Sequence, residues 1–227
     1  MKKLLTIALA VAFGFMMVSS AFAAANSTPK STTGASPISL DAEIYTDVSA
    51  ELTLAVDYAT VVLTTGGSGI GDFLDGITGG TVYGDHIWTV TCNNTTGYEL
   101  ALKQMTGAKS GGGTDGALTH TTDNTFEFLP MSGAGTPQAT FPTPAAGATA
   151  FGYSITASDS TLDAAWTLGY WNAVTTGDIK LLDQTTPSAE AGDDTTIRWQ
   201  ARFTTGGGQY LKNGTYKEFV TLTASTQ

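Results

Sequence analysis

The chain has 227 residues, a formal net charge of −10 and only 13% charged residues, with one cysteine and two histidines. The negative charge excludes a basic nucleic-acid binder, because it repels a phosphate backbone, and a single cysteine excludes a framework of internal disulfides. A hydrophobic fraction of 41% is enough to bury the core of one domain.

The first 23 residues have the features of a secretory signal peptide. Lys2 and Lys3 give a positive start, residues 4–18 are mainly apolar, and Ala21-Phe22-Ala23 supplies a small-x-small cleavage pattern. An uncleaved membrane anchor is the alternative interpretation. Cleavage removes two lysines and leaves eight basic against twenty acidic residues, a net charge of about −12. No later stretch has the roughly 18 apolar residues of a spanning helix, so we expect a secreted, surface-associated protein without a membrane span.

Residues 24–37 consist mainly of Ala, Ser, Thr, Asn, Lys and Pro and show no apolar periodicity. This composition predicts a flexible leader ahead of an ordered domain at 38–227. The domain begins with Ile38-Ser39-Leu40, a short alternating segment. We expect this segment to pair with a sheet edge; pairing within its own domain, which is close in sequence, is favoured over pairing with a neighbouring chain.

From residue 51 onward the dominant period is two. Leu52, Leu54, Val56 and Tyr58 share one face of residues 51–58, which predicts a half-buried strand. Further strands are expected at 86–92, 98–102, 125–129, 151–155, 197–203 and 216–224. The segment 93–97 (N-N-T-T-G) lies between two of these runs and predicts a hairpin turn.

No window of a dozen residues shows a convincing helical stripe; the best candidate, 160–171, is interrupted by Gly169. The sequence therefore predicts an all-β fold. The expected architecture is a single antiparallel β-sandwich, Ig-like or jelly-roll, with about eight to eleven strands. Long Gly- and Thr-rich loops are expected at 66–84, 106–124 and 130–147.

Three segments carry a resemblance to secreted bacterial cell-surface proteins. Residues 88–100 (W-T-V-T-C-N-N-T-T-G-Y-E-L) resemble the strand–turn–strand motif V-x-V-x-T-N-x-x-x-G-Y-x-L of these proteins. Residues 151–154 and 214–224 are similar to their W-G-Y strand and terminal G-x-Y-x-x-x-V-T-x-T-A strand. Cys92 and Phe151 depart from these motifs, where Thr and Trp are usual. The likeness to WxL-like and spore-coat-like exoproteins implies an extracellular sandwich without catalytic residues.

The residues that could carry catalysis are few. His86 and His120 are far apart in the sequence and belong to no metal or catalytic motif, and Gly67-Ser68-Gly69 lacks the spacing of a nucleophile elbow. We therefore expect no enzymatic activity and no cofactor. Cys92 has no nearby basic residue to stabilise a thiolate, so we expect it to be a small buried hydrophobe.

Acidic residues gather at two places in the sequence. Asp72, Asp75 and Asp85 form one group, and Asp193 with Asp194 forms the other. Oxygen-rich loops hold calcium in some extracellular modules, but the ligand spacing of an EF-hand is absent. Solvated acidic loops are therefore favoured over a metal site.

The strand predicted at 197–203 has one apolar face and one cationic face. Its apolar face includes Trp199, which we expect in the core. Arg198 and Arg202 lie on the opposite face, where they could meet an anionic partner. Pairing with carboxylates on neighbouring strands is the favoured interpretation.

Two functions remain open after this survey. The first is a non-enzymatic structural or interaction protein, which binds cell-envelope components or other copies of itself through sheet edges. The uncharged end of the predicted strand 216–224 favours this hypothesis. The alternative is an extracellular carbohydrate-binding module that stacks sugar rings on Trp166, Tyr170 and Trp171. Packing of these three aromatics in the core is the favoured interpretation.

Overall fold

The computed structural model describes residues 51–65, 78–105, 113–132, 136–208 and 210–227. The predicted signal peptide, the leader, the 38–40 segment, Asp72 and Asp75 lie outside these residues. The described residues form eleven strands and no helix, so the predicted all-β fold is confirmed there. The strands are β1 Leu52–Val56, β2 Gly80–Cys92, β3 Tyr98–Gln104, β4 Leu118–His120, β5 Glu127–Phe128, β6 Thr149–Ser158, β7 Trp171–Asn172, β8 Ile179–Gln184, β9 Asp193–Phe203, β10 Tyr216–Lys217 and β11 Val220–Thr226.

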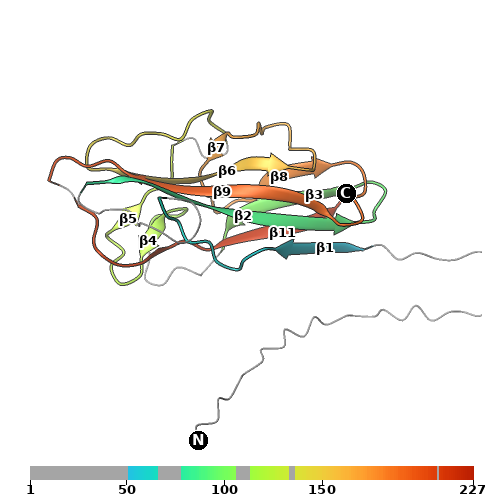
Figure 1. The fold of residues 1–227 in the computed structure, drawn as a ribbon, viewed down its shortest axis with the longest axis horizontal. Helices are drawn as coiled ribbons and strands as arrows, with labels where there is room; N and C mark the ends of the chain where they lie inside the picture. Colours follow the sequence, from blue (N-terminus) through green and yellow to red (C-terminus); the bar gives the residue numbers. More distant parts are fainter. Residues whose placement is uncertain (1–50, 66–77, 106–112, 133–135, 209) are drawn as a thin grey trace, which may run out of the picture. The chain divides into compact units, whose positions relative to one another are not determined.

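The strands are arranged in three antiparallel sheets. A large sheet has the order β1-β2-β9-β6-β7, a second sheet has the order β11-β3-β8, and a small sheet has the order β10-β4-β5. Figure 1 shows the long strands of the large sheet in front of β3, β8 and β11, with β4 and β5 toward one end. The small sheet was not predicted, because the segment 106–124, expected to be a loop, contains β4.

The centre of the large sheet is β9, which pairs with β2 on one side and β6 on the other. Its apolar face is Ile197, Trp199, Ala201 and Phe203, each at most 3% exposed. Trp199 contacts the rings of Phe151 and Tyr153 on β6. Side chains from the large and second sheets belong to the same buried cluster, so the two sheets share one core. The core position predicted for Trp199 is confirmed.

The hairpin predicted at 93–97 is wrong. Both sides of β2 are occupied, by β1 and β9, so β3 cannot pair with it and instead lies between β11 and β8. The 93–97 segment therefore crosses from the large sheet to the second sheet. Gly97 has φ +86°, and a Cβ there would lie 1.9 Å from the carbonyl oxygen of Gln184. Only glycine fits this crossing without displacing β8.

Cys92 lies at the start of this crossing and is 2% exposed, which confirms its predicted burial. Its sulfur accepts a hydrogen bond from the Asn94 amide at 3.4 Å. Nearby, the Tyr98 hydroxyl donates to Asp193 at 2.8 Å and so joins β3 to β9. Burial, the largest cause, raises the pKa of Tyr98 far above its usual range. The crossing is thus fastened to both layers.

The strand predicted at 216–224 is interrupted. Its first part is β10, which pairs with β4 in the small sheet, and its second part is β11, which pairs with β3. The break falls at Glu218 and Phe219, where the Phe219 carbonyl accepts a hydrogen bond from the Met105 amide at 2.8 Å. The chain therefore changes sheets here. The alternation continues through the break because both parts bury side chains of the same parity.

Candidate functional site

One lateral edge of the two main sheets is covered by neighbouring chain. At β7, Gln138 and Trp171 exchange two backbone hydrogen bonds of 2.7 and 2.8 Å. At β8, the Asp163 amide bonds to the Leu181 carbonyl and the Asp183 amide bonds to the Thr161 carbonyl, both at 3.0 Å. We call this side, β7 and β8, the covered edge. Its backbone groups are largely unavailable to another chain.

The opposite side is formed by β1 in the large sheet and β11 in the second sheet, which lie next to each other (Figure 1). We call these two strands the open edge. Among the described residues, no strand pairs with the outer side of either one. Neither strand contains a charged residue or a proline, and neither pairing has a bulge. The usual devices that block a sheet edge are therefore absent from both strands.

The hydrogen-bond pattern shows which backbone groups of the open edge point outward. In β11, bonds of Phe219 to Met105 and of Gln227 to Gly97 place the odd-numbered residues against β3. Because bonded and non-bonded pairs alternate in an antiparallel ladder, Val220, Leu222 and Ala224 direct their amide and carbonyl groups away from β3. The same reasoning, from Asp57 to Ile87, directs those of Leu54 outward in β1.

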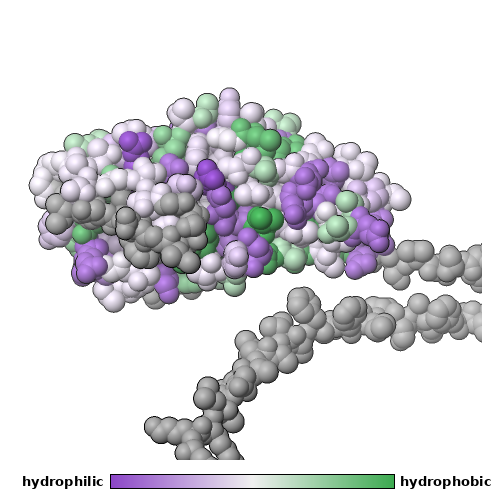
Figure 2. Space-filling view, viewed as in Figure 1, coloured by the Kyte–Doolittle hydropathy of each residue, from purple (hydrophilic) through white to green (hydrophobic). Residues whose placement is uncertain are grey.

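The broad face seen in Figure 2 shows fewer features of an interaction surface than the open edge does. Its described part is a mixture of hydrophilic and hydrophobic residues, with the hydrophobic ones in small separate areas. Large contiguous apolar patches are the surface sign of a docking face, and this view does not show one. Backbone pairing at the open edge is therefore the better candidate for an interaction.

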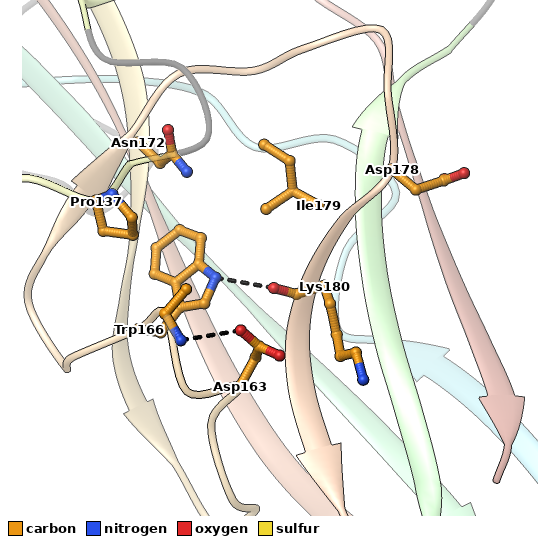
Figure 3. Close-up of a pocket in the computed structure, with 8 residues that line it drawn as sticks. Pro137, Asp163, Trp166, Asn172, Asp178, Ile179 and Lys180 are labelled. Carbon is orange, nitrogen blue, oxygen red and sulfur yellow. Dashed lines mark hydrogen bonds between the residues drawn. The ribbon is translucent and has the colours of Figure 1, made fainter.

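A pocket of about 260 Å³ lies near the covered edge (Figure 3). Trp166 forms one wall, and its indole Nε1 donates to the Lys180 carbonyl at 2.9 Å. Asp163 accepts a hydrogen bond from the Ala165 amide at 3.0 Å, which fixes the turn that carries the tryptophan. The residues that line the pocket are Pro137, Asp163, Ala165, Trp166, Asn172, Asp178, Ile179 and Lys180.

Two charged residues that line the pocket form ion pairs with residues outside it. Lys180 forms an ion pair with Glu99 at 2.5 Å, and this hydrogen bond is the main reason why the pKa of Lys180 is raised. Asp178 pairs with Lys103 at 3.1 Å. In Figure 3 the side chains of Asp178 and Lys180 point away from Trp166, while Asn172, Pro137 and Ile179 surround it. The pocket interior is therefore mainly apolar, with one amide.

The three aromatics proposed for sugar stacking do not form one strip. Trp166 is 6% exposed and packs against the Tyr153 ring on the core side of the large sheet. Trp171 is half-buried, lies beside Ser154 on the other face of that sheet, and packs edge-on against Phe141. Tyr170 is half-buried and does not line the pocket. Only Trp166 reaches the pocket, and its ring faces are packed.

Asp85, proposed as a metal ligand, is paired with an arginine. Both of its carboxylate oxygens accept hydrogen bonds from Arg198, each at 2.8 Å, and the guanidinium lies 4.7 Å from the centre of the Tyr83 ring. The bond to Asp85 is the main cause of the raised pKa of Arg198. The predicted cross-strand pairing is confirmed for Arg198. Arg202 lies opposite Thr81 and Ala150, neither of which is acidic.

The second acidic pair points to opposite sides of β9. Asp193 is buried and bonds to Tyr98 and to the Ala189 amide, whereas Asp194 accepts a hydrogen bond from the Thr89 hydroxyl at 2.6 Å. Within the part of the chain that the structure describes, no three His, Cys, Asp or Glu side chains gather as metal ligands would. Nor does that part contain a helix long and apolar enough to cross a membrane.

The two histidines lie in different sheets. His86 is on β2, where its Nδ1 accepts a hydrogen bond from the Trp199 indole at 3.2 Å. Burial lowers the pKa of His86, and the nearby Asp57 carboxylate partly opposes this. His120 is on β4 and packs edge-on against Tyr216. The fold therefore gives each histidine a separate packing environment.

Sequence reasoning missed most of the pocket. Asn172 is fully buried, Lys180 lies on β8 and Asp178 directly precedes it; β8 was not predicted. The run 179–184 (I-K-L-L-D-Q) lacks a clear period of two, because its adjacent leucines are both buried. The charged residues near the ends of this run are its only distinctive feature in the sequence. The open edge was anticipated for the last strand and not for β1.

No family model matches the chain, and no curated protein matches it significantly.

Proposed function

We propose that this chain is a secreted, non-enzymatic protein of the cell surface that acts by associating with copies of itself or with envelope components through its open sheet edge. The observation that carries the proposal is the uncharged, unblocked pair of strands β1 and β11. The signal-peptide pattern and the likeness to WxL-like and spore-coat-like exoproteins support the location. The shared core of the large and second sheets supports a β-sandwich, with the small sheet as an addition.

The chemistry of such an association is backbone pairing. An incoming strand gains main-chain hydrogen bonds from the outward groups of β11, while alternate side chains reach the half-buried apolar residues beside it. Val220 and Ala224 of β11 and Leu54 of β1 are such residues. The gain is greatest where the edge is long, and β11 offers seven residues.

The test combines location with assembly state. Fractionation of cells that produce the natural chain should recover it at the surface or outside the cell. For the chain expressed from Ala24, light scattering over a concentration series should show species larger than one chain. Ala224→Pro removes an outward amide without breaking the β3 ladder, and should shift the distribution to single chains. Ala224→Ser keeps that amide and should not. Retention inside the cell would reject the proposal, and single chains at every concentration would reject association between copies.

Carbohydrate binding is the second candidate, and the pocket beside Trp166 is the observation that favours it. With Trp166 packed and Asn172 fully buried, recognition would depend on the Asp163 carboxylate rather than on ring stacking. Titration of the chain with wall oligosaccharides, followed by tryptophan fluorescence, should then give a saturable change that Trp166→Phe reduces. A signal that persists unchanged in Trp166→Phe would place the sugar elsewhere.

A further inference from the structure

The alternation of β1 extends far upstream of the strand. From Ile38 to Val56 every even-numbered residue except Thr46 is apolar, and the odd-numbered ones are mostly polar or acidic. The apolar positions upstream of β1 are Ile38, Leu40, Ala42, Ile44, Val48 and Ala50. A period of two sustained in one phase is the pattern of a single extended strand with one apolar face. Residues 38–50 thus have the sequence of a strand that continues β1 toward its N-terminus.

Among the described residues, the large sheet pairs with this continuation only as far as Glu51, whose carbonyl accepts a hydrogen bond from the Asn93 amide at 3.2 Å. The last residue of β2, Cys92, lies opposite Leu52, and the chain then leaves the large sheet through the 93–97 crossing. A strand that continued β1 upstream of Leu52 would extend past the end of β2. Its backbone groups would then bond either to water or to the edge of another sheet.

Folding back onto the open edge of the same molecule is disfavoured by the sequence. Of the residues that tight turns favour, 38–57 contain Asp and Ser but no Gly, Pro or Asn. A two-residue hairpin also pairs residue i with i+3, so the apolar face would have to change from even to odd positions across the turn. The apolar residues remain on even positions up to Val56. The pattern therefore favours a donor segment over a hairpin.

We propose that residues 38–50 of one copy add as a strand to the β11 edge of a second copy. This inference rests on the proposed function and names its partner. The even-numbered side chains Leu40 and Ile44 would join the apolar face formed by Val220, Leu222 and Ala224. At about 3.4 Å per residue, thirteen residues are long enough to cover all seven of β11.

Donor and acceptor are different parts of the molecule, which determines the form of the assembly. The donor precedes β1, and the acceptor is β11, so each copy can give one strand and receive one. Such a heterologous contact produces open filaments or closed rings, of which a reciprocal exchange between two copies is the smallest. Each copy carries about −12 charges after cleavage, so added salt should strengthen the assembly by screening the repulsion.

The central test uses paired substitutions on the two faces of the donor. In the chain from Ala24, Leu40→Asp with Ile44→Asp places two charges on the apolar face, and light scattering should show a fall to the mass of one chain. The matched control, Ser39→Asp with Tyr45→Asp, adds the same charge to the polar face and should keep at least most of the assembly. Denaturation midpoints of both variants should equal that of the unmodified chain.

A mixing experiment tests the direction of donation. The Leu40→Asp, Ile44→Asp variant keeps its β11 acceptor, and Ala224→Pro keeps its donor, so each should be a single chain alone and the mixture should give a complex of two. Absence of that complex would overturn the inference. So would a lowered denaturation midpoint of the donor variant, which would show that the segment pairs within its own domain.

The two proposals fail differently. If Ala224→Pro dissolves the assembly but the donor variant does not, the edge association stands and strand donation is wrong. If the unmodified chain is a single chain at every concentration and salt level, association between copies and strand donation are both wrong.

Discussion

The two lateral edges of this molecule differ in whether neighbouring segments of the chain form hydrogen bonds with their outer strands. At the covered edge, two short connections bond to β7 and β8 through Gln138 and Thr161. At the open edge, β1 and β11 meet no such connection among the described residues. Both edges carry apolar side chains toward the common core, so the difference lies in the backbone. It shows that a sheet can be sealed on one side by its own loops while the other side keeps its hydrogen-bonding groups available.

The largest expected effect is at the centre, which both edges share. Trp199→Ala removes a side chain that is 3% exposed and contacts both Phe151 and Tyr153, so it should lower the free energy of unfolding by about 3–5 kcal/mol. Chemical denaturation measures this. A midpoint shift smaller than that of a single edge substitution would show that the centre of the large sheet is not the main source of the domain's stability.

The contrast between the edges is tested by two leucines of the same size. Leu182 on β8 is fully buried, so Leu182→Ala should cost about 2–5 kcal/mol. Leu54 on β1 is only partly buried, and in single chains Leu54→Ala should cost about 1 kcal/mol, because less apolar area is lost. Denaturation at a concentration below assembly gives both values. Equal losses would remove the distinction between a sealed and an open side.

A smaller effect on the free energy of unfolding is expected at acidic pH, from His86 on β2, the strand between β1 and β9. Burial lowers the pKa of His86 below 6.5 in the folded chain, so the unfolded chain binds a proton first as the pH falls. Stability from this group is complete above pH 6.5 and declines below it, by at most about 1.4 kcal/mol per pH unit. His86→Gln keeps an acceptor for Trp199 and should flatten the decline between pH 7 and 5. Equal slopes in both proteins would assign the decline to other groups.

The smallest perturbation is chemical labelling of Cys92, because it requires no substitution and leaves the native contacts intact before the reagent is added. Cys92 is opposite Leu52 at the end of the open edge and is 2% exposed. A thiol reagent should react with it slowly in native conditions and fast in denaturant. The native rate measures how often the crossing opens beside β1. Immediate labelling under native conditions would mean that the crossing beside the open edge opens frequently.

The sequence predicts this fold unevenly, and the reason is physical. Alternation reports which side chains face a core, so Trp199, Cys92 and the strands around them could be identified in advance. It does not report which neighbour a strand will pair with, and so 93–97 was interpreted as a hairpin although it joins two sheets. The break at Phe219 was hidden for the same reason, because β10 and β11 keep one phase.

The candidate site was harder to predict than the strands. The pocket depends on Asn172, Asp163 and Lys180, which come from three segments and carry no shared motif. Trp166 was recognised, but its burial depends on Tyr153, a residue on another strand. The open edge could be anticipated for β11 because a lack of charge is visible in sequence. Its neighbour β1 could not be placed there until the order of the sheets was known.

The position of β9 in the chain also governs when the molecule can fold. Asp85 and Arg198 are 113 residues apart in the sequence yet adjacent in the large sheet, and β6 reaches β9 only across the intervening β7 and β8. Neither β2 nor β6 can complete its pairing with β9 until residue 203 has left the ribosome. Folding should therefore be slow and late, as expected for a topology rich in distant contacts. Until then, the backbone groups of the open edge are exposed together with those of the other strands of the nascent chain.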